Sequence, residues 1–481
     1  MSRRVGRSVP AAGGGRRPRR WSRVIASLGL GVALVGAAGS ASGLPAAGSG
    51  GGRLEENLSK NGSEWAIGEP QIAVDPTDPK RLFLGWNTFP VPLDIGASTA
   101  DIEACGGLVS TNAGRTWKKV EPPYNHIPDT LGCGDIVAAA GPDGTLYAGG
   151  ITPTFTAEAE GGITVGGLGI IVHGRDVVSS SNDWGRTWSK PVVTVSSDGA
   201  RTVGGSPVDT FDRPWLAVDQ SDGTVYASGR NLLASEGGIG GQRFVTASTN
   251  KARSFDPVFP IDSGDYPQSG SGTIAAAHGA LAVAYAAASA TGATCPCVIF
   301  ETSTDHGKTF HRHVVPLVDA TDAPSPFLAA DPTTKGRFAV TILDSTGTSL
   351  QVYVTDDSGE TWHEPVRVGE DPPNERFKPW LSYGPSGQLD LVWRTRYSDG
   401  SYDVSAATGR HDDQNGARFS APLKISTEAA PYPQGYYGGD DFSFIIGNDQ
   451  FVHVGWGDSR NGPTQAWYGR IPRKAFEAGD G

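Results

Sequence analysis

The sequence predicts an all-β fold, a β-propeller of four-stranded blades. Three observations lead to this prediction. A short polar motif recurs five times, pairs of short apolar strands recur seven times, and no long stretch carries apolar residues at helical spacing. Self-similarity at intervals of 52 to 71 residues is typical of propellers, solenoids and arrays. Four strands in each unit match the composition of a propeller blade.

The chain begins with the features of an export signal. Residues 3–23 carry eight arginines and no acid, residues 24–38 are apolar, and the small-residue run "AAGSASG" follows. This order predicts a signal peptide over residues 1–43, a glycine-rich linker over residues 44–53, and a propeller domain over residues 54–481. The apolar stretch is short for the alternative, an uncleaved membrane anchor. We therefore expect a secreted, extracellular protein; "RRWSRVI" leaves general and twin-arginine export both open.

Seven strand pairs, each an apolar strand, a turn and a second apolar strand, open the successive units. They start at Glu69, Cys133, Asp212, Ser271, Pro324, Lys378 and Gly439. Seven pairs favour seven blades, and six blades are the alternative if one pair is an addition. The last unit has room for one strand after Trp456, so we expect residues 54–67 to supply the missing strand and close the ring.

The polar motif reads as a turn between the third and fourth strands of a blade. Its copies are "STNAGRTW", "SNDWGRTW", "STNKARSF", "STDHGKTF" and "TDDSGETW", which start at Ser110, Ser181, Ser248, Ser303 and Thr355. An Asp or Asn oxygen can accept hydrogen bonds from backbone N–H groups downstream, and Gly supplies a positive φ. The final aromatic ring can be buried between sheets. A structural role is therefore predicted for Asn112, Asp183, Asp305 and Asp357.

Cysteine content and charge limit the partners. Four cysteines suit an oxidising compartment. Cys105 and Cys133 are expected to bridge adjacent blades, whereas Cys295 and Cys297 could bridge each other only in a strained loop. Removal of the leader's eight arginines lowers the net charge from −11 to −19, which disfavours nucleic acid and anionic lipid. The histidine spacing suggests no metal site, and we expect neither a metal nor a cofactor. We also expect a monomer.

A functional site is expected on the face away from the polar turns. The start of a blade's first strand and the end of its second strand share that face, because the two strands form a hairpin. Charged residues cluster at these positions, and we expect Arg213, Arg394 and Arg460 to converge near the axis. The full set, with one tyrosine beside the charged residues, is Glu69, Asp135, Asp212, Arg213, Arg230, Glu375, Arg376, Lys378, Arg394, Arg396, Tyr397, Asp440, Asp441, Asp458 and Arg460.

The polar turns resemble the Asp boxes of the bacterial neuraminidase repeat, and the strand pairs resemble those of secreted sialidase-like proteins. The resemblance extends from about residue 69 to residue 472. It implies a propeller that acts on glycans as an exo-glycosidase of undetermined sugar specificity. Sialidases clamp the substrate carboxylate with three arginines, which bind it in a bidentate way, and attack with a tyrosine activated by a glutamate.

Individual residues follow from the same resemblance. "FDRPWLAVD" is similar to the family's Tyr-Arg-Ile-Pro signature, which implies a clamp role for Arg213, and Glu375 and Arg394 bracket a strand pair as the family's Glu and second Arg do. The last unit opens with "GDDFSF" where the family has its tyrosine, and Tyr437 lies just upstream. The predicted catalytic residues are Glu375, Tyr437, Asp440, Asp441 and Asp458; the predicted substrate-binding residues are Arg213, Arg230, Arg394, Arg396 and Arg460.

Two alternatives remain open beside the exo-glycosidase. One is a non-catalytic propeller that binds glycan or protein on its charged face. The other is a lyase on uronic-acid polysaccharides, in which Arg neutralises the carboxylate and Tyr or His abstracts the neighbouring proton. Hydrolysis gives a new reducing end, whereas elimination gives an unsaturated product that absorbs ultraviolet light.

Overall fold

A computed structural model describes most of the chain. The described residues are 52–59, 66–89, 105–121, 133–157, 163–165, 168–197, 201–204, 211–231, 242–261, 268–287, 297–321, 325–432, 443–462 and 464–477. They all belong to one compact unit, Ser49–Gly481. The predicted signal peptide and most of the predicted linker lie outside the described residues.

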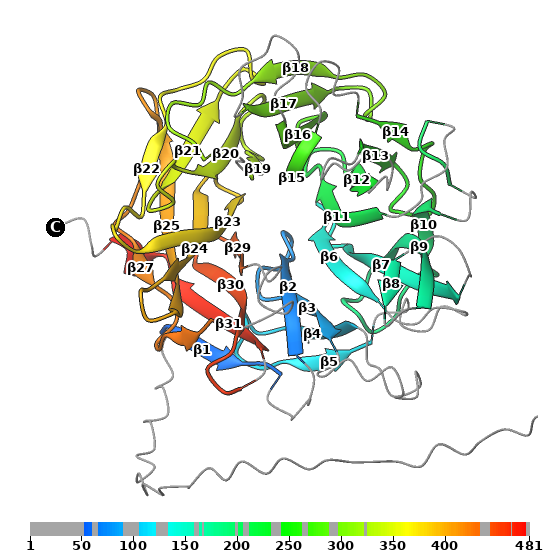
Figure 1. Ribbon diagram of the computed structural model, residues 1–481, viewed down its shortest axis with the longest axis horizontal. Coiled ribbons are helices and arrows are strands. Elements are labelled where there is room, and N and C mark those ends of the chain that lie inside the picture. Colours follow the sequence, from blue (N-terminus) through cyan, green and yellow to red (C-terminus); the bar gives the residue numbers. More distant parts are fainter. Residues whose placement is uncertain are drawn as a thin grey trace, which may run out of the picture. The chain divides into compact units, whose positions relative to one another are not determined.

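Seven antiparallel sheets of four main strands each surround a common axis, which confirms the seven-bladed propeller (Figure 1). The blades are numbered in chain order, beginning with the sheet that holds β2. Blade 1 holds β2 (Ala66–Val74), β3 (Leu82–Phe89), β4 (Cys105–Ser110) and β5 (Lys118–Val120). Blade 2 holds β6 (Gly134–Ala140), β7 (Leu146–Ala157), β9 (Leu168–Ser181) and β10 (Val192–Ser196), with β8 (Ile163–Val165) beside β9.

The next three blades repeat this order. Blade 3 holds β11 (Phe211–Val218), β12 (Val225–Asn231), β13 (Gln242–Ser248) and β14 (Phe259–Pro260). Blade 4 holds β15 (Gln268–Ala277), β16 (Ala280–Ala287), β17 (Cys297–Ser303) and β18 (His311–Val314). Blade 5 holds β19 (Phe327–Ala330), β20 (Phe338–Leu343), β21 (Leu350–Thr355) and β22 (Val366–Val368).

The last two blades complete the ring. Blade 6 holds β23 (Glu375–Tyr383), β24 (Leu389–Arg396), β25 (Ser401–Asp412) and β26 (Gly416–Phe419), and β27 (Leu423–Lys424) and β28 (Ala430–Pro431) also pair with β25. Blade 7 holds β29 (Ser443–Gly447), β30 (Phe451–Asp458) and β31 (Gln465–Pro472). The only helix among the described residues is the short α2 (Lys474–Glu477).

The N-terminal strand β1 (Leu54–Asn57) is the fourth strand of blade 7. It pairs antiparallel with β31, in a register that runs from Leu54 opposite Arg470 to Asn57 opposite Trp467. The expectation that this part of the chain closes the ring is therefore confirmed. The two ends of the described chain share one sheet, so both contribute to the same blade.

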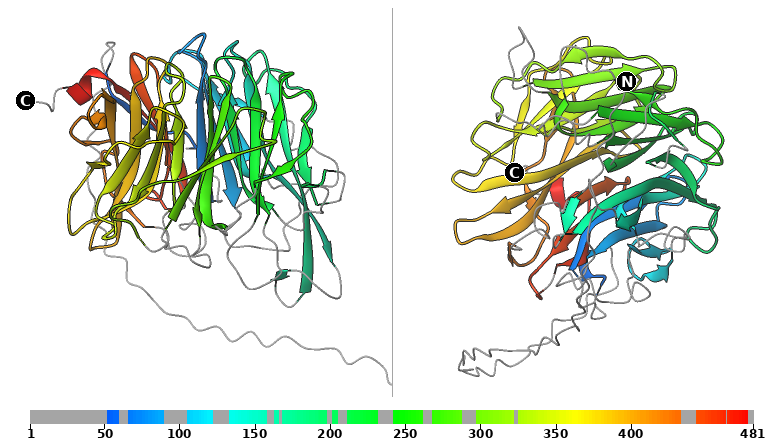
Figure 2. Two further views of the ribbon diagram at one scale, coloured as in Figure 1. Left: turned by 90° about the horizontal axis from the view of Figure 1, so that it is seen from above. Right: turned by 45° about the vertical axis from the view of Figure 1, so that its right-hand side comes forward.

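The first strand of each blade lies nearest the axis (Figure 1). Seen from the side, the strands run between the two faces of the ring (Figure 2). First strands of four blades fill the centre with aromatic rings: the Trp380 ring centroid lies 5.0 Å from that of Trp215, 5.3 Å from Phe327 and 4.4 Å from Phe444. Edge-on and tilted aromatic contacts at such distances stabilise a core beyond the area that they bury.

The repeated polar turns have the geometry that the sequence predicts. In the blade 4 turn, Asp305 accepts hydrogen bonds from the Thr309 backbone N–H (2.9 Å) and hydroxyl (2.7 Å). Gly307 has a φ of 82°, and a Cβ there would lie 2.5 Å from Val245 Cγ1 of blade 3. The same carboxylate or amide contacts recur at Asn112, Asp183 and Asp357. In each of these turns, the Asp or Asn side chain thus provides a hydrogen-bond acceptor for a backbone N–H group of the same turn.

The predicted disulfide joins the first two blades. Cys105 on β4 is bonded to Cys133, which directly precedes β6, with their Cα atoms 5.5 Å apart. Cys297 is also disulfide-bonded, whereas Cys295 lies outside the described residues. No described helix is long and apolar enough to cross a membrane.

Candidate active site at the ring axis

Four first strands contain a bulge that places a charged residue in a left-handed conformation. The strand register breaks after Gly68, Gly134, Asp212 and Phe377. The residue directly after each of these positions has a positive φ: 52° at Glu69, 46° at Asp135, 53° at Arg213 and 49° at Lys378. Bulges re-aim side chains, and left-handed non-glycine residues cost about 1–3 kcal/mol, a strain that concentrates at functional sites.

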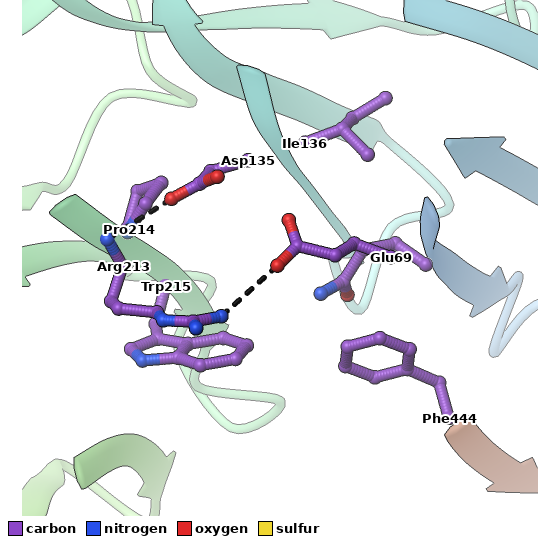
Figure 3. A pocket seen from close by; sticks show the side chains of 8 residues that line it. Glu69, Asp135, Ile136, Arg213, Pro214, Trp215 and Phe444 are labelled. Carbon is purple, nitrogen blue, oxygen red and sulfur yellow. Dashed lines mark hydrogen bonds and ion pairs between the residues drawn. The ribbon is translucent and has the colours of Figure 1, made fainter. Parts of the chain in front are cut away.

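Three of these residues line one pocket at the axis. Glu69, Asp135 and Arg213 come from blades 1, 2 and 3, and Arg213 and Glu69 point toward each other (Figure 3). The other lining residues are Gln71, Ile136, Pro214, Trp215 and Phe444. The pocket holds about 230 Å³ of space including its open mouth. Its apolar wall is part of the central aromatic cluster.

Glu69 is held from two sides. Arg213 Nη1 lies 3.0 Å from its Oε1, and Asn87 Nδ2 donates to its Oε2 at 2.7 Å. Asn87 is fixed in turn, since its Oδ1 accepts a hydrogen bond from the Ile136 N–H at 2.9 Å. An arginine and an amide donor on opposite oxygens are partners that suit an ionised carboxylate.

Asp135 is placed to hold a proton. Burial and the nearby charge of Asp212 raise the pKa of Asp135 to about 6, against the lowering effects of Arg213 and Glu69. Its Oδ2 accepts a hydrogen bond of 3.1 Å from the Arg213 backbone N–H. A carboxyl group with such a pKa can donate a proton near neutral pH.

A second buried acid lies behind the first in blade 2. Asp176 on β9 is 3% exposed, and burial raises its pKa to about 7, with the charge of Asp135 adding to the effect. Thr194 Oγ1 lies 2.7 Å from its Oδ2. No charged partner of Asp176 is found among the described ion pairs, so the protonated form is the one that its surroundings favour.

The predicted arginine clamp is not assembled in this pocket. Arg213 lines it, but Arg394 is fully buried, donates to the Gly457 carbonyl at 3.3 Å and lies 5.1 Å from the Tyr402 ring. Arg230 is bound to Asp212 at 2.5 Å. The expected convergence of Arg213, Arg394 and Arg460 near the axis is therefore wrong for the latter two residues.

Asp458 and Arg460 hold the N-terminal strand. Arg460 Nη2 lies 2.7 Å from Asp458 Oδ2 and 2.9 Å from Glu55 Oε1, and its guanidinium lies 4.0 Å from the Trp467 ring. All three charged side chains are at most 8% exposed. Glu55 belongs to β1, so this ion network joins the two ends of blade 7.

The remaining predicted residues divide into two groups. Glu375 and Arg396 form an ion pair of 3.0 Å on blade 6, and the guanidinium lies 4.2 Å from the Tyr432 ring and 5.0 Å from the Phe377 ring. Neither residue lines the axial pocket. Tyr437, Asp440 and Asp441 lie outside the described residues, and their predicted catalytic roles stay predictions.

Sequence reasoning placed Glu69 and Asp135 in the charged ring but did not select them as catalytic. A usable signal exists, because "EPQ" at Glu69, "RPW" at Arg213 and "KPW" at Lys378 occupy the same place in their blades. Asn87, Gln71, Trp215 and Phe444 carry no such signal. The described residues contain no cluster of His, Cys, Asp and Glu that could hold a metal ion.

No family model matches the sequence, and no curated protein matches it. Among solved structures, a protein of unknown function from Dyadobacter fermentans has 12% identity and a TM-score of 0.47, over 87% of this chain and 99% of that one. The Hadza microbial sialidase Hz136 has 16% identity and a TM-score of 0.45, over 82% and 77%. Trypanosoma rangeli sialidase has 13% identity and a TM-score of 0.44, over 71% and 54%. At these scores the likenesses assign neither a family nor an activity.

Proposed function

We propose that the protein acts on glycans as an exo-glycosidase whose axial pocket takes one terminal sugar. The observation that carries the proposal is the pocket itself, in which Asp135, with a pKa raised to about 6, and Glu69 face Arg213 beside the Trp215 and Phe444 rings. Hydrolysis of a glycosidic bond commonly uses a carboxylic acid as proton donor and a second carboxylate, and aromatic rings offer a surface on which a sugar can pack.

The closed centre of the ring favours action at a chain end. The Trp215 and Phe444 rings that line the pocket belong to the central aromatic cluster, which blocks passage of a polymer along the axis. The end of a glycan is therefore the substrate element that we assign to this pocket.

The chemistry assigns a role to each side chain. Asp135 gives its proton to the glycosidic oxygen as the bond from that oxygen to the anomeric carbon breaks. Glu69 stabilises the positive charge that develops at the anomeric carbon. A water oxygen adds to this carbon, and the proton that it releases returns to Asp135. Arg213 orients Glu69 and can bind an anionic group on the sugar.

The two alternatives are less well supported by this geometry. A lyase needs a Tyr or His base, and neither residue type is among the described residues that line the pocket. A binding propeller needs no group with a raised pKa. Export through the predicted signal peptide, and action outside the cell as a monomer, remain part of the proposal on the grounds given by the sequence.

A panel of glycans tests the proposal. Purified protein should release a terminal monosaccharide from at least one oligosaccharide, without an ultraviolet-absorbing product, and Asp135→Asn should abolish the release. Asp143→Asn is the matched control, because Asp143 lies in a turn of the same blade and pairs with Lys251. Glycan binding without turnover would favour the binding propeller, and an unsaturated product would favour the lyase; either result would overturn the proposal.

A further inference from the structure

Asn87 is a buried polar residue between blades 1 and 2, beside the axial pocket. It lies on β3 and is 1% exposed. Its Nδ2 donates to Glu69 Oε2 at 2.7 Å, and its Oδ1 accepts from the Ile136 N–H at 2.9 Å. Asp135 directly precedes Ile136. One amide group therefore connects the Glu69 carboxylate of blade 1 to the backbone that carries Asp135 in blade 2.

These two contacts fix the orientation of the amide. An ionised carboxylate can only accept a hydrogen bond, and a backbone N–H can only donate one. Rotation of the amide by half a turn would bring its oxygen against the Glu69 oxygen and its NH₂ group against the Ile136 N–H. Asn87 therefore satisfies both partners in a single arrangement, and a fully bonded buried polar group of this kind specifies one geometry of its surroundings.

Packing brings the two blades close together at the same junction. A Cβ on Gly85 of β3 would lie 2.6 Å from Ile136 Cδ1, so β3 has no side chain where Ile136 packs. A Cβ on Gly150 of β7 would lie 2.8 Å from the Gly134 carbonyl oxygen. A larger side chain at either glycine would displace the backbone on which Asp135 lies.

The Cys105–Cys133 disulfide crosses this junction next to Asn87. Cys105 is the residue of β4 that pairs with Asn87, and its Sγ lies 4.0 Å from Asn87 Oδ1. Cys133 precedes Asp135 with one residue between them. Asp135 is thus flanked by two links to blade 1, a covalent link at Cys133 and a hydrogen bond at Ile136.

The repeat does not account for Asn87. In each blade with a bulge, one residue of the second strand pairs with the position before the left-handed residue; these residues are Asn87, Ile151, Arg230 and Arg394. The isoleucine has no polar side-chain group, and an arginine side chain donates but does not accept. Among the four described bulges, a side chain that can do both lies opposite the bulge of blade 1.

We propose that Asn87 is a positioning residue of the axial site, which holds the Glu69 carboxylate and Asp135 in their relative positions, and that the Cys105–Cys133 disulfide keeps this arrangement in place. The inference rests on the proposed function, which assigns the two acids their roles. Asn87 acts through Glu69 and through the backbone next to Asp135. Its loss should therefore slow the chemical step more than it weakens substrate binding.

Steady-state kinetics on a glycan that wild type hydrolyses test the role. Asn87→Leu removes both hydrogen bonds, so kcat should fall by about tenfold to hundredfold while KM changes little. Asn87→Asp keeps the acceptor for the Ile136 N–H but places a carboxylate oxygen against Glu69. Its kcat should also fall, and the deficit relative to wild type should shrink as pH falls, because a protonated carboxyl at position 87 can donate again. Asn87→Asp carries the test alone if Asn87→Leu does not fold.

Asn448 provides the matched control. It is 5% exposed, and its Oδ1 accepts from the Gln450 and Phe451 N–H groups, at 2.9 and 2.8 Å. Asn448→Leu should lower the melting temperature but leave kcat unchanged, because this residue follows the end of β29, whereas the bulges lie near the starts of their strands. An equal loss of kcat in Asn448→Leu, or an unchanged kcat in Asn87→Leu, would overturn the proposal.

The part of the disulfide is tested with the double variant Cys105→Ala, Cys133→Ala. Well below its melting temperature, this variant should have a lower kcat and a KM close to that of wild type. Because the disulfide and Asn87 hold the same junction, adding Asn87→Leu should reduce kcat by less than the product of the two separate factors. A double variant with wild-type kcat, or factors that simply multiply, would contradict the coupling.

A titration separates this inference from the proposed function. Carbon-13 NMR of the side-chain carboxyls, assigned with Asp135→Asn, follows the proton that Glu69 and Asp135 hold, with the pKa of Asp135 about 6 in wild type. Loss of the Asn87 donor disfavours the charged form of this pair, so Asn87→Leu should move the titration to higher pH, and Asn448→Leu should not. If wild type releases no sugar from any glycan, the proposed function fails; a shifted titration would still support the positioning role, and an unchanged one would overturn it.

Discussion

Arg213 and Glu69 are 144 residues apart in the sequence, yet Arg213 Nη1 lies 3.0 Å from Glu69 Oε1. Both residues sit on left-handed bulges, and both side chains are nearly buried, at 13% and 9% exposed. The ion pair joins blades 1 and 3, which lie on either side of blade 2 in the ring. Asp135 of blade 2 accepts a hydrogen bond from the Arg213 backbone N–H. Three separate blades therefore build one charged site.

The pH profile of turnover should report Asp135. Its pKa lies near 6 because of burial and the charge of Asp212, and the proposed donor works only while protonated. On the substrate found with the glycan panel, kcat/KM should fall by about tenfold per pH unit above this value. Activity that stays constant from pH 5 to pH 8 would exclude Asp135 as the donor.

Replacing Arg213 should move this profile. The Arg213 charge lowers the pKa of Asp135, so Arg213→Met should shift the alkaline limb upward by about one pH unit. Arg396→Met, which removes an arginine of blade 6, should leave the limb in place. Loss of activity without a shift would indicate that Arg213 only binds substrate.

Asp176→Asn should stabilise the fold at high pH. The native pKa of about 7 exceeds the ordinary aspartate pKa of 3.8, so the native state retains a proton that the unfolded chain releases between these values. The native state therefore loses stability as pH rises. The Asp176→Asn variant avoids this loss, because Asn does not titrate. The gain in unfolding free energy should be near zero at pH 4 and should reach at most about 4 kcal/mol above pH 8.

Urea unfolding at several pH values measures this effect. Asp143→Asn should have the opposite sign, because hydrogen bonds from Lys251 and Thr145 outweigh burial and lower the pKa of Asp143. Its removal costs stability at neutral pH, and the cost disappears as pH falls through the lowered pKa. A pH-independent effect of Asp176→Asn would show that Asp176 is ionised in the native state.

The polar turns should matter for stability alone. Asp305→Ala removes the acceptor for the Thr309 N–H and hydroxyl and should lower the unfolding free energy by about 1–2 kcal/mol. Asp305→Asn is the matched control, because Asn112 makes equivalent contacts with Thr116 in the first turn. Substrate turnover should be unchanged in both variants; its loss with an intact melting temperature would contradict the structural role.

The network around Arg460 should also act through stability. Arg460→Ala leaves Glu55 and Asp458 buried without their cation, at a cost of about 3–5 kcal/mol. The combined variant Glu55→Gln, Asp458→Asn, Arg460→Met should recover much of this loss, since no charge stays unpaired. Calorimetric melting gives the comparison, and altered kcat in the folded combined variant would return these residues to the active site.

The repeat pattern was sufficient for the fold but not for the site. The seven strand pairs, the five polar turns and a closing role for residues 54–67, of which 54–57 form β1, could all be derived from the sequence. The error came from treating both ends of a hairpin as equally near the axis. The first strand is innermost, and each further strand lies about 4.8 Å farther out. Arg230, Arg394 and Arg396 lie on second strands and Arg460 just after one. Arg230 and Arg396 pair with acids of their own blades, Arg394 donates to the Gly457 carbonyl of blade 7, and Arg460 reaches Glu55 of β1.

The bulges were beyond the reach of pattern reasoning. Alternation along β2 gives no warning that the register breaks between Gly68 and Gln71, and a left-handed Glu or Arg is not expected from propensity. These breaks turn Glu69, Asp135 and Arg213 toward the pocket. The predicted roles of Tyr437, Asp440 and Asp441 fall outside the described residues.

The pairing of β1 with β31 also sets an order of assembly. Leu54 meets Arg470, so β1 gains its partner only after all the intervening blades have been made. Contacts of such long sequence separation are slow to form, because the chain loses the entropy of loop closure before the new contact stabilises it. Until then blade 7 lacks its outer strand and β31 presents an open edge to other chains. Ring closure is thus the late step of folding, and the stage at which this protein is most exposed to association with copies of itself.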